Sequence, residues 1–519
     1  MIKTHFEKGE PNKNQIVINM VFSIVAFILN LGISFFITPY ITKQFGSEAY
    51  GFVKLASDFT NYASLISIAL NSMASRFLML EREQGNLDEA KKYFSSITLA
   101  NVVLSIALAV PAVLCVVCLE YFLSIPAALV PEVKITFAIT FATFILHLLF
   151  STYGNCYYLT NKLSIHSVCS ALATILRVVC IILLFSVTSP KISYIAIGGL
   201  AAALFTTVYN LHYTKTLLPE FRFSHRDFQW KKLWVVVSTG IWNSITKLSQ
   251  IFSSGLDLLL TNVMISPQMM GYLSVAKTVP GIAASFNSTV ANVFSPNLMR
   301  LYAKNDIEGL KKTAKSAMKF MSLFVSIPNA ILITMGKDFF DLWVPGQPTQ
   351  IINILSILTI INSCITGPTQ PLYQIFTITN KIRQSSLVLI LYGFVSITAT
   401  YLCVQFTDLG VYAVAGISLI GSVIVALAYH IPYAALYIGL PKHTFFPEIG
   451  LNVISLGVLC VVGFAINFFM DLSSSWFMWF AGASLTGILG LLINAILILN
   501  KEERNNLFLK LKGKLRRSK

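Results

Sequence analysis

Charged residues are scarce in this sequence. Asp, Glu, Lys and Arg make up 12% of its 519 residues, whereas soluble domains usually contain about 25%. Hydrophobic residues make up 55%, and the mean hydropathy is +0.71. A soluble protein of this size could not cover its surface with so little charge. Because the apolar runs reach about 20 residues, enough to cross a hydrocarbon core roughly 30 Å thick, the sequence predicts an integral membrane protein.

The sequence also lacks motifs for catalysis and metal binding. It has no phosphate-binding loop ending in Gly-Lys-Ser/Thr, no HExxH, no paired-cysteine site and no nucleophile elbow. Its 8 cysteines are scattered, mostly within apolar runs, so neither disulfides nor a metal cluster is expected. No strand-like alternation is sustained, which argues against an outer-membrane barrel. The sequence therefore predicts an all-α membrane protein that is not an enzyme and has no cofactor.

Fourteen segments are long and apolar enough to cross the bilayer as helices. The first is too long for a signal-peptide core and is expected to remain as a span. The second and eighth are the least hydrophobic, so thirteen or twelve spans are alternatives. The expected ranges are 16–40, 50–73, 94–118, 132–154, 163–187, 192–213, 233–258, 270–297, 313–335, 350–376, 384–405, 409–433, 449–470 and 476–499.

The basic residues predict how these spans are oriented. With fourteen spans, one side of the membrane receives both termini and 29 of the 38 Lys and Arg residues, the other side receives 5, and 4 lie in or at the edge of spans. Because basic residues concentrate in cytoplasmic segments, both termini are expected in the cytoplasm. The net charge of +16 is thus a topology signal. We do not interpret it as nucleic-acid binding.

A weak internal repeat suggests two halves. Comparing residues 51–92 with 271–312 without gaps gives 8 identities in 42 positions, more than the biased composition would give by chance. Six-span halves in the same orientation imply a pseudo-two-fold axis along the membrane normal, with substrate bound between the halves. The expected parts are an N-terminal lobe (1–213), a cytoplasmic inter-lobe loop (214–232), a C-terminal lobe (233–439), a final pair of spans (440–500) and a basic cytoplasmic tail (501–519).

Polar residues recur at helical spacing within several expected spans. A charge at the bilayer centre costs about 2.5–3.5 kcal/mol, so such residues usually face a bundle interior or a wet cavity. Interhelical hydrogen bonding in a tight bundle is the alternative, and it is favoured for Ser and Thr alone. The stripes are Asn243, Lys247, Gln250, Ser254 and Asp257 in span seven; Lys54, Asp58, Asn61 and Ser64 in span two; Ser274, Lys277, Gly281, Ser285, Ser288 and Asn292 in span eight; and His166, Ser170, Thr174 and Arg177 in span five.

The charges within the spans are mainly cationic. Lys54 and Asp58 are four residues apart and are expected to neutralise each other largely. The remaining cations suit an anionic substrate such as a phosphate or pyrophosphate. Each has an ordinary alternative, because Lys277 can snorkel to the outer end of its span and Arg177 can cap carbonyls or pair across helices. His166 is more often an interior histidine than a proton relay.

Two stretches resemble a known family. "ITKQFGSEAYGFVKLASDFTNYASLISIALNSMASRFL" (41–78) resembles the outer loop and second span of bacterial polysaccharide flippases, the Wzx-like O-antigen flippases. "LDLLLTNVMISPQMMGYLSVAKTVPGIAASF" (256–286) resembles their seventh-to-eighth span region. These flippases share the MOP superfamily with multidrug and oligosaccharidyl-lipid exporters, which have a MATE-like fold. The likeness rests on a Phe-Gly…Tyr-Gly turn, a small-residue run before Arg76, and Asp257 ahead of Gly271-Tyr272.

The resemblance implies a substrate and partners. The substrate would be an oligosaccharide on undecaprenyl pyrophosphate, moved by alternating access from the cytoplasmic to the outer leaflet for O-antigen (lipopolysaccharide), capsule or exopolysaccharide synthesis. The protein would lie in the bacterial cytoplasmic (inner) membrane, with a groove for the polyprenyl tail beside its last two spans. A polysaccharide polymerase and chain-length machinery would be its protein partners.

This implied function gives the polar residues roles. Lys247, Lys277 and Arg177 are expected to hold the pyrophosphate. Coupling to a Na⁺ or H⁺ gradient would use a carboxylate or histidine, and the membrane potential is the alternative energy source. The polar lining of the cavity is assigned to Asn243, Gln250, Asn61 and Lys54, and ion coupling to Asp58, Asp257 and His166.

Rival functions remain open from the sequence. A MATE-type cation-coupled multidrug antiporter has the same fold, but it would be expected to place unopposed carboxylates in its lumen. A membrane-embedded glycan polymerase would usually need a large charged outer loop, and the longest outer loop here, around 336–349, is short. A scaffold role is disfavoured by the charges within the spans.

Overall fold

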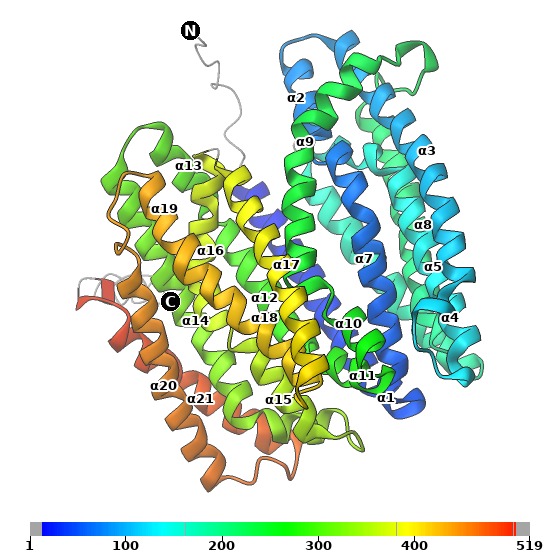
Figure 1. Ribbon diagram of the computed structural model, residues 1–519. Helices are drawn as coiled ribbons and strands as arrows, with labels where there is room; N and C mark the ends of the chain where they lie inside the picture. Colours follow the sequence, from blue (N-terminus) through cyan, green and yellow to red (C-terminus); the bar gives the residue numbers. More distant parts are fainter. Residues whose placement is uncertain (1–12, 161, 380, 502, 505–519) are drawn as a thin grey trace, which may run out of the picture. The chain divides into compact units, whose positions relative to one another are not determined.

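The protein is built from helices joined by short turns (Figure 1). The computed structural model describes residues 13–160, 162–379, 381–501 and 503–504, and these contain no β-strand. Eleven helical segments within them are long and apolar enough to cross a membrane. The predicted all-α, multi-pass membrane architecture is therefore confirmed. Most of the tail expected at 501–519 lies outside the described residues.

The fourteen expected spans all fall on helix, but three are not among the eleven segments. The first lies mostly where side chains are not described. The seventh and eighth are broken into shorter pieces, at a π-helical turn over Ile251–Gly255 and at Lys277. These two spans carry the densest polar stripes, so the interruptions lie where the sequence is least apolar.

Packing divides the chain into two units. The first comprises Met1–Phe45 and Phe52–Leu248, and the second comprises Gly46–Gly51 and Ser249–Lys519. The expected lobe boundary at 214–232 precedes the packing boundary by one helix. A packing unit need not coincide with a lobe that moves during transport, so the lobe assignment stays a prediction.

The first unit is a bundle in which neighbouring helices pack in the order α3, α5, α8 and α7 (Figure 1). Its core lies between α2, α3 and the short α6, around Leu78, Phe94 and Tyr157. Helix α9 joins it through Gly240, whose missing side chain leaves room for the Ala69 backbone. The helices are α1 (Lys13–Asn71, except Gly46–Gly51), α2 (Ala74–Glu83), α3 (Leu87–Val117), α4 (Leu119–Phe122), α5 (Val130–Leu149), α6 (Cys156–Leu159), α7 (Leu163–Val187), α8 (Ser193–Leu217) and α9 (Trp230–Gln250, up to Leu248).

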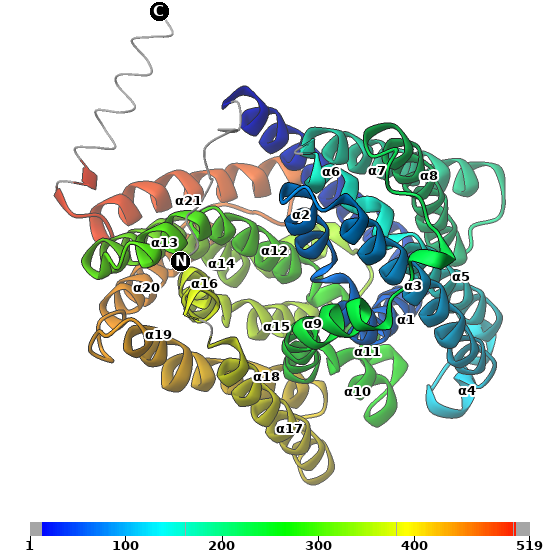
Figure 2. The same cartoon turned by 90° about the horizontal axis from the view of Figure 1, so that it is seen from above.

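The second unit is organised around its longest helix, α14, which packs against α16, α20 and α21 (Figure 2). Asp306 caps this helix by accepting a hydrogen bond from the Gly309 backbone N–H at 2.8 Å. Its helices are α10 (Asp257–Met264), α11 (Pro267–Ala276), α12 (Thr278–Asn292), α13 (Ser295–Ala303), α14 (Ile307–Trp343), α15 (Thr349–Ile360), α16 (Ser363–Ile378), α17 (Ile382–Phe406), α18 (Val411–Val425), α19 (Ile431–Tyr437), α20 (Phe446–Phe469) and α21 (Trp476–Leu497).

Helix boundaries follow the weak internal repeat. Each unit has a helix that stops, a short helix, a tight turn and then a long helix, displaced by about 220 residues. The turn contains Gly85 at φ +81° in the first unit and Asn305 at φ +54° at the equivalent position. Glycine and asparagine are the residues that enter this left-handed region most readily. The repeat thus reflects a shared helix–turn–helix pattern.

Gly51 and Gly271, which occupy the same position of the repeat, lie against each other in the second unit. A Cβ on Gly51 would come within 3.1 Å of Gly271 Cα, and a Cβ on Gly271 would come within 2.5 Å of the Ser47 carbonyl carbon. The approach follows a bend in α1 at Gly46, where φ is +84°. Tyr50 then bonds Thr278 of α12, with 3.0 Å between the hydroxyls. Only glycine permits so close an approach.

Candidate functional site

Arg177 lines a cavity of about 290 Å³ inside the first unit. Its Nε is buried and has no hydrogen-bond partner among the described residues. No Asp or Glu belongs to the described lining, so the charge of Arg177 has no carboxylate opposite it there. The lining comes from α1, α5, α7 and α8 and consists of Val53, Ser57, Thr136, Thr140, Thr143, His147, Arg177, Ile195, Ala196, Gly199, Ala202, Ala203 and Thr206.

The hydroxyls in this lining are already used as donors. Thr140 donates to the Thr136 carbonyl at 2.7 Å, and Thr143 donates to the Ile139 carbonyl at 2.8 Å. The other lining hydroxyls, of Ser57, Thr136 and Thr206, also donate to carbonyls four residues back in their own helices. A hydroxyl that has donated its hydrogen keeps its lone pairs as acceptors. The cavity therefore combines the N–H donors of the Arg177 guanidinium with a set of hydroxyl oxygens that can accept hydrogen bonds.

Helix α9 carries Lys247 and Asn243. The Asn243 side chain donates to the Ser72 hydroxyl at 3.0 Å, and Ser244 one residue on donates to the Leu65 carbonyl at 2.6 Å. These bonds fix α9 against the second part of α1. Lys247 is half-buried and forms no ion pair with any described residue. It is thus a second cation of the first unit without an opposing carboxylate.

The remaining predicted residues of the first unit lie on α1 and α7. Lys54 and Asp58 are half-buried, and Asn61 is exposed. His166 is also exposed, and its ring lies 5.4 Å from that of Tyr157. Of the stripe predicted for the fifth span, only Arg177 lines the cavity. The ion-coupling roles of Asp58 and His166 stay predictions.

In the second unit, Lys277 forms an ion pair with Asp257. Its Nζ lies 2.5 Å from Asp257 Oδ2, and the Ser418 hydroxyl donates to Asp257 Oδ1 at 3.1 Å. Asp257 is 5% exposed, and the Lys277 side chain is 25% exposed. A carboxylate at this depth requires a cation. The pair explains why a lysine lies within an apolar stretch, without recourse to snorkelling.

The assumption of one continuous helix over 233–258 is wrong. Helix α9 ends at Gln250, a π-helical turn follows, and α10 begins at Asp257. A π-helical turn changes the rotation per residue, so Asp257 no longer shares a face with Lys247. The packing boundary also separates them, with Lys247 in the first unit and Gln250, Asp257 and Lys277 in the second.

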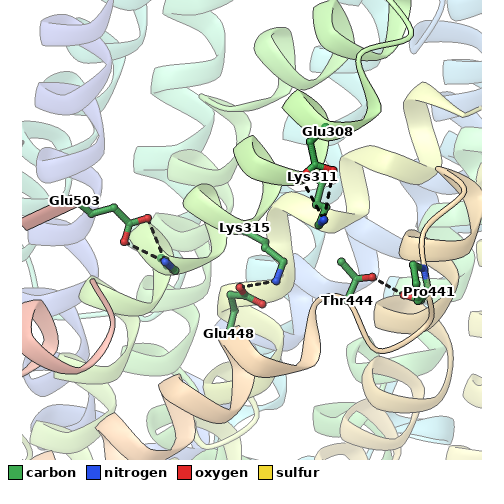
Figure 3. Close-up of polar contacts among 8 residues, drawn as sticks. Glu308, Lys311, Lys315, Pro441, Thr444, Glu448 and Glu503 are labelled. Atoms are coloured by element: carbon green, nitrogen blue, oxygen red, sulfur yellow. Dashed lines mark hydrogen bonds and ion pairs between the residues drawn. The ribbon is translucent and has the colours of Figure 1, made fainter. Parts of the chain in front are cut away.

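Three lysines spaced four residues apart on α14 each pair with a carboxylate (Figure 3). Lys315 reaches Glu448 at the start of α20, with 3.0 Å between Nζ and Oε1. Lys319 pairs with Glu503 at 3.0 Å, and Lys311 pairs with Glu308 at 3.2 Å. Each of these three cations has a carboxylate, and two of the pairs tie the start of α20 and the segment after α21 to α14. These lysines are not a free anion site.

The sequence prediction missed the polar face of α5. Its members lie at spacings of 4, 3 and 4 residues, as in the stripes that were recognised, and the structure places all of them in the cavity lining. The spacing alone did not indicate a cavity, because threonines within a span usually form hydrogen bonds between packed helices. The face consists of Thr136, Thr140, Thr143 and His147. Among the described residues, no group of His, Cys, Asp and Glu is placed to hold a metal ion.

Comparison with solved structures defines the class of protein. A structure of the lipid II flippase MurJ in its inward closed conformation matches with a TM-score of 0.64, at 14% identity, over 93% of this chain and 98% of that chain. An inward-facing multidrug resistance transporter of the MATE family matches with a TM-score of 0.61, at 12% identity, over 81% of this chain and 98% of that one. The chain thus shares the MATE-like fold of these transporters, as the resemblance implied.

A curated relative matches over nearly the whole chain. The uncharacterized membrane protein EpsK of Bacillus subtilis (strain 168) is 29% identical over 492 residues, which are 94% of this chain and 96% of that protein. No protein-family model matches the chain.

Proposed function

We propose that the protein is a flippase for oligosaccharide units linked to undecaprenyl pyrophosphate. It carries them from the cytoplasmic to the outer leaflet for synthesis of a cell-surface polysaccharide. The observation that carries the proposal is the occurrence of cations without carboxylate partners, Arg177 and Lys247, on a MOP-superfamily fold. Such cations suit a phosphate-bearing substrate better than a cationic drug.

The physical task supports this choice. Sugar hydroxyls and phosphates cannot cross hydrocarbon unaided, because each unpaired polar group costs several kcal/mol. Arg177 and Lys247 offset that cost for the phosphates, and Asn243, Gln250, Asn61 and Lys54 offer polar contacts for sugar or water. Lys277 is the weakest member of the predicted pyrophosphate set, because Asp257 already compensates its charge. It contributes only if the pair opens during transport.

The membrane potential is one possible driving force for this transport. Moving a net charge of minus two outward through an inside-negative potential gains roughly 4.6 kcal/mol per 100 mV. Exchange of Na⁺ or H⁺ through Asp58, Asp257 or His166 is the alternative. In this proposal both termini are cytoplasmic, the membrane is the bacterial inner membrane, and a polymerase with its chain-length machinery takes over the flipped unit.

The test is a deletion of the gene followed by extraction of polyprenyl-linked glycans from each leaflet. The expected result is a complete but unpolymerised unit that accumulates on the cytoplasmic leaflet, together with loss of surface polysaccharide. Complementation with the intact gene should reverse both effects. Normal surface glycan with altered tolerance to cationic drugs would overturn the proposal in favour of a multidrug antiporter.

A further inference from the structure

We infer that the cavity around Arg177 is a binding site for a single sugar that carries one negatively charged group, a carboxylate or a phosphate. The site lies wholly within the first unit. The inference rests on the proposed function only in assigning the sugar to a lipid-linked glycan. Binding itself can be measured without transport.

The need for a negative charge follows from Arg177. Its guanidinium is permanently charged and carries five N–H donors. Its Nε is buried and without a hydrogen-bond partner, and none of the described lining residues is acidic. A buried cation is normally paired, because desolvation without a partner costs several kcal/mol. A ligand carboxylate or phosphate can bind the fork through two parallel hydrogen bonds and meets this need.

The need for hydroxyls follows from the oxygens of the lining. Thr140 and Thr143 of α5 have committed their hydrogens to their own helix and retain acceptor lone pairs. A bare anion such as chloride would face these lone pairs with no hydrogen to offer. A polyol supplies the missing donors. A ligand that combines one anionic group with several hydroxyls therefore satisfies both halves of the cavity, and a charged sugar is such a ligand.

The size of the cavity limits the ligand to about one sugar ring. Small-molecule sites usually measure roughly 300–1,000 Å³, and this cavity, at about 290 Å³, lies at the lower end. A whole oligosaccharide does not fit. Two sources of a charged sugar are compatible with the proposed function: an acidic residue within the glycan, and the residue bonded to the linking phosphate.

The test measures thermal unfolding of the purified full-length protein in detergent, at constant ionic strength. The probes are glucuronate, glucose 1-phosphate, glucose, acetate and inorganic phosphate. We expect at least one charged sugar to raise the melting temperature by about 2 °C or more, and glucose, acetate and phosphate at equal concentration to leave it unchanged. A larger effect of glucuronate would indicate an acidic glycan residue, and a larger effect of glucose 1-phosphate would indicate the linkage sugar.

Two variants and a control assign the effect to the cavity. Arg177→Gln should abolish the shift, whereas Arg226→Gln, which removes an exposed arginine in the inter-lobe loop, should preserve it. The double variant Thr140→Val/Thr143→Val preserves the side-chain shape and should lower the apparent affinity for the charged sugar at least threefold. It tests the same cavity if Arg177→Gln fails to fold. Equal stabilisation by acetate or phosphate, a shift that survives Arg177→Gln, or no shift with either charged sugar would each overturn the inference. None of these outcomes depends on whether the protein flips a lipid.

Discussion

Asp257 and Lys277 place opposite charges in an otherwise apolar part of the second unit. They are 20 residues apart, and the helix breaks at both ends of α10–α11 bring them together. Asp257 is the more buried of the two, so it depends more on its partner than Lys277 does. A buried pair of this kind contributes little net stability, but removal of one member leaves an uncompensated charge.

We predict that Lys277→Met destabilises the protein more than Asp257→Asn, by roughly 3 kcal/mol against 1–2 kcal/mol. Lysine removal leaves a buried carboxylate without its cation, whereas Asp257→Asn leaves a lysine that is less buried than the carboxylate. The double variant should recover more than half of the loss. Thermal unfolding of the three variants in detergent measures the coupling, and strictly additive effects would show that the pair does not interact.

Lys247 offers the most direct test of the proposed pyrophosphate contact. Lys247→Glu should abolish glycan export while the protein inserts normally, because a carboxylate repels the phosphates. Lys247→Arg should retain most of the export, since the positive charge remains. Surface polysaccharide in a deletion strain that carries each variant is the measurement. Unchanged export by Lys247→Glu would remove this residue from the proposed site.

At the scale of elements, the glycines of the repeat serve as contact points between helix backbones. The segment Gly46–Gly51 packs against the start of α11, and the backbones touch at Gly51 and Gly271. Small residues allow helices within a membrane to approach closely enough for extensive van der Waals contact. Close backbone contact therefore requires glycine at these two positions. The sequence alone showed the two glycines only as an identity within a weak repeat.

Gly271→Ala should destabilise the protein by about 1–3 kcal/mol or prevent folding, because the added methyl group meets the backbone of Ser47 and Glu48, which cannot rotate away. Gly281→Ala is the matched control, since nothing lies within 4 Å of a Cβ at that position of α12. Alanine there should be neutral or slightly stabilising. Yield of monodisperse protein and thermal unfolding report both changes. Equal behaviour of the two variants would contradict the close-contact interpretation.

At the scale of the whole molecule, the distribution of Lys and Arg predicts which loops face the cytoplasm. Most basic residues, 29 of 38, fall on one side if all fourteen expected spans cross the bilayer. That arrangement requires the interrupted seventh and eighth spans to cross as well, although neither is among the eleven long apolar segments. The orientation of the segment between these two spans is therefore a direct test of the span count.

Reporter fusions after Pro190, between α7 and α8, and after Phe223, between α8 and α9, should give opposite signals. Alkaline phosphatase is expected to be active after Pro190 and inactive after Phe223, because the second loop carries the basic residues. A fusion after Ser266, between α10 and α11, should again be active if the two interrupted spans both cross, and inactive if neither does. Activity after Phe223, or its absence after Ser266, would contradict the proposed topology.

The sequence by itself determined the class of protein, a helical membrane protein, and the approximate positions of most of its helices. These depend on composition and on the length of apolar runs, both of which act within a few turns of chain. Only the tertiary structure paired Lys277 with Asp257, because the ends of α10 at Met264 and of α11 at Ala276 lie between them and a regular helical period cannot anticipate such breaks. Likewise, only the packing of four helices placed the threonines of α5 beside Arg177. The sequence pattern of threonines in a span is the same whether they contact a neighbouring helix or line a cavity.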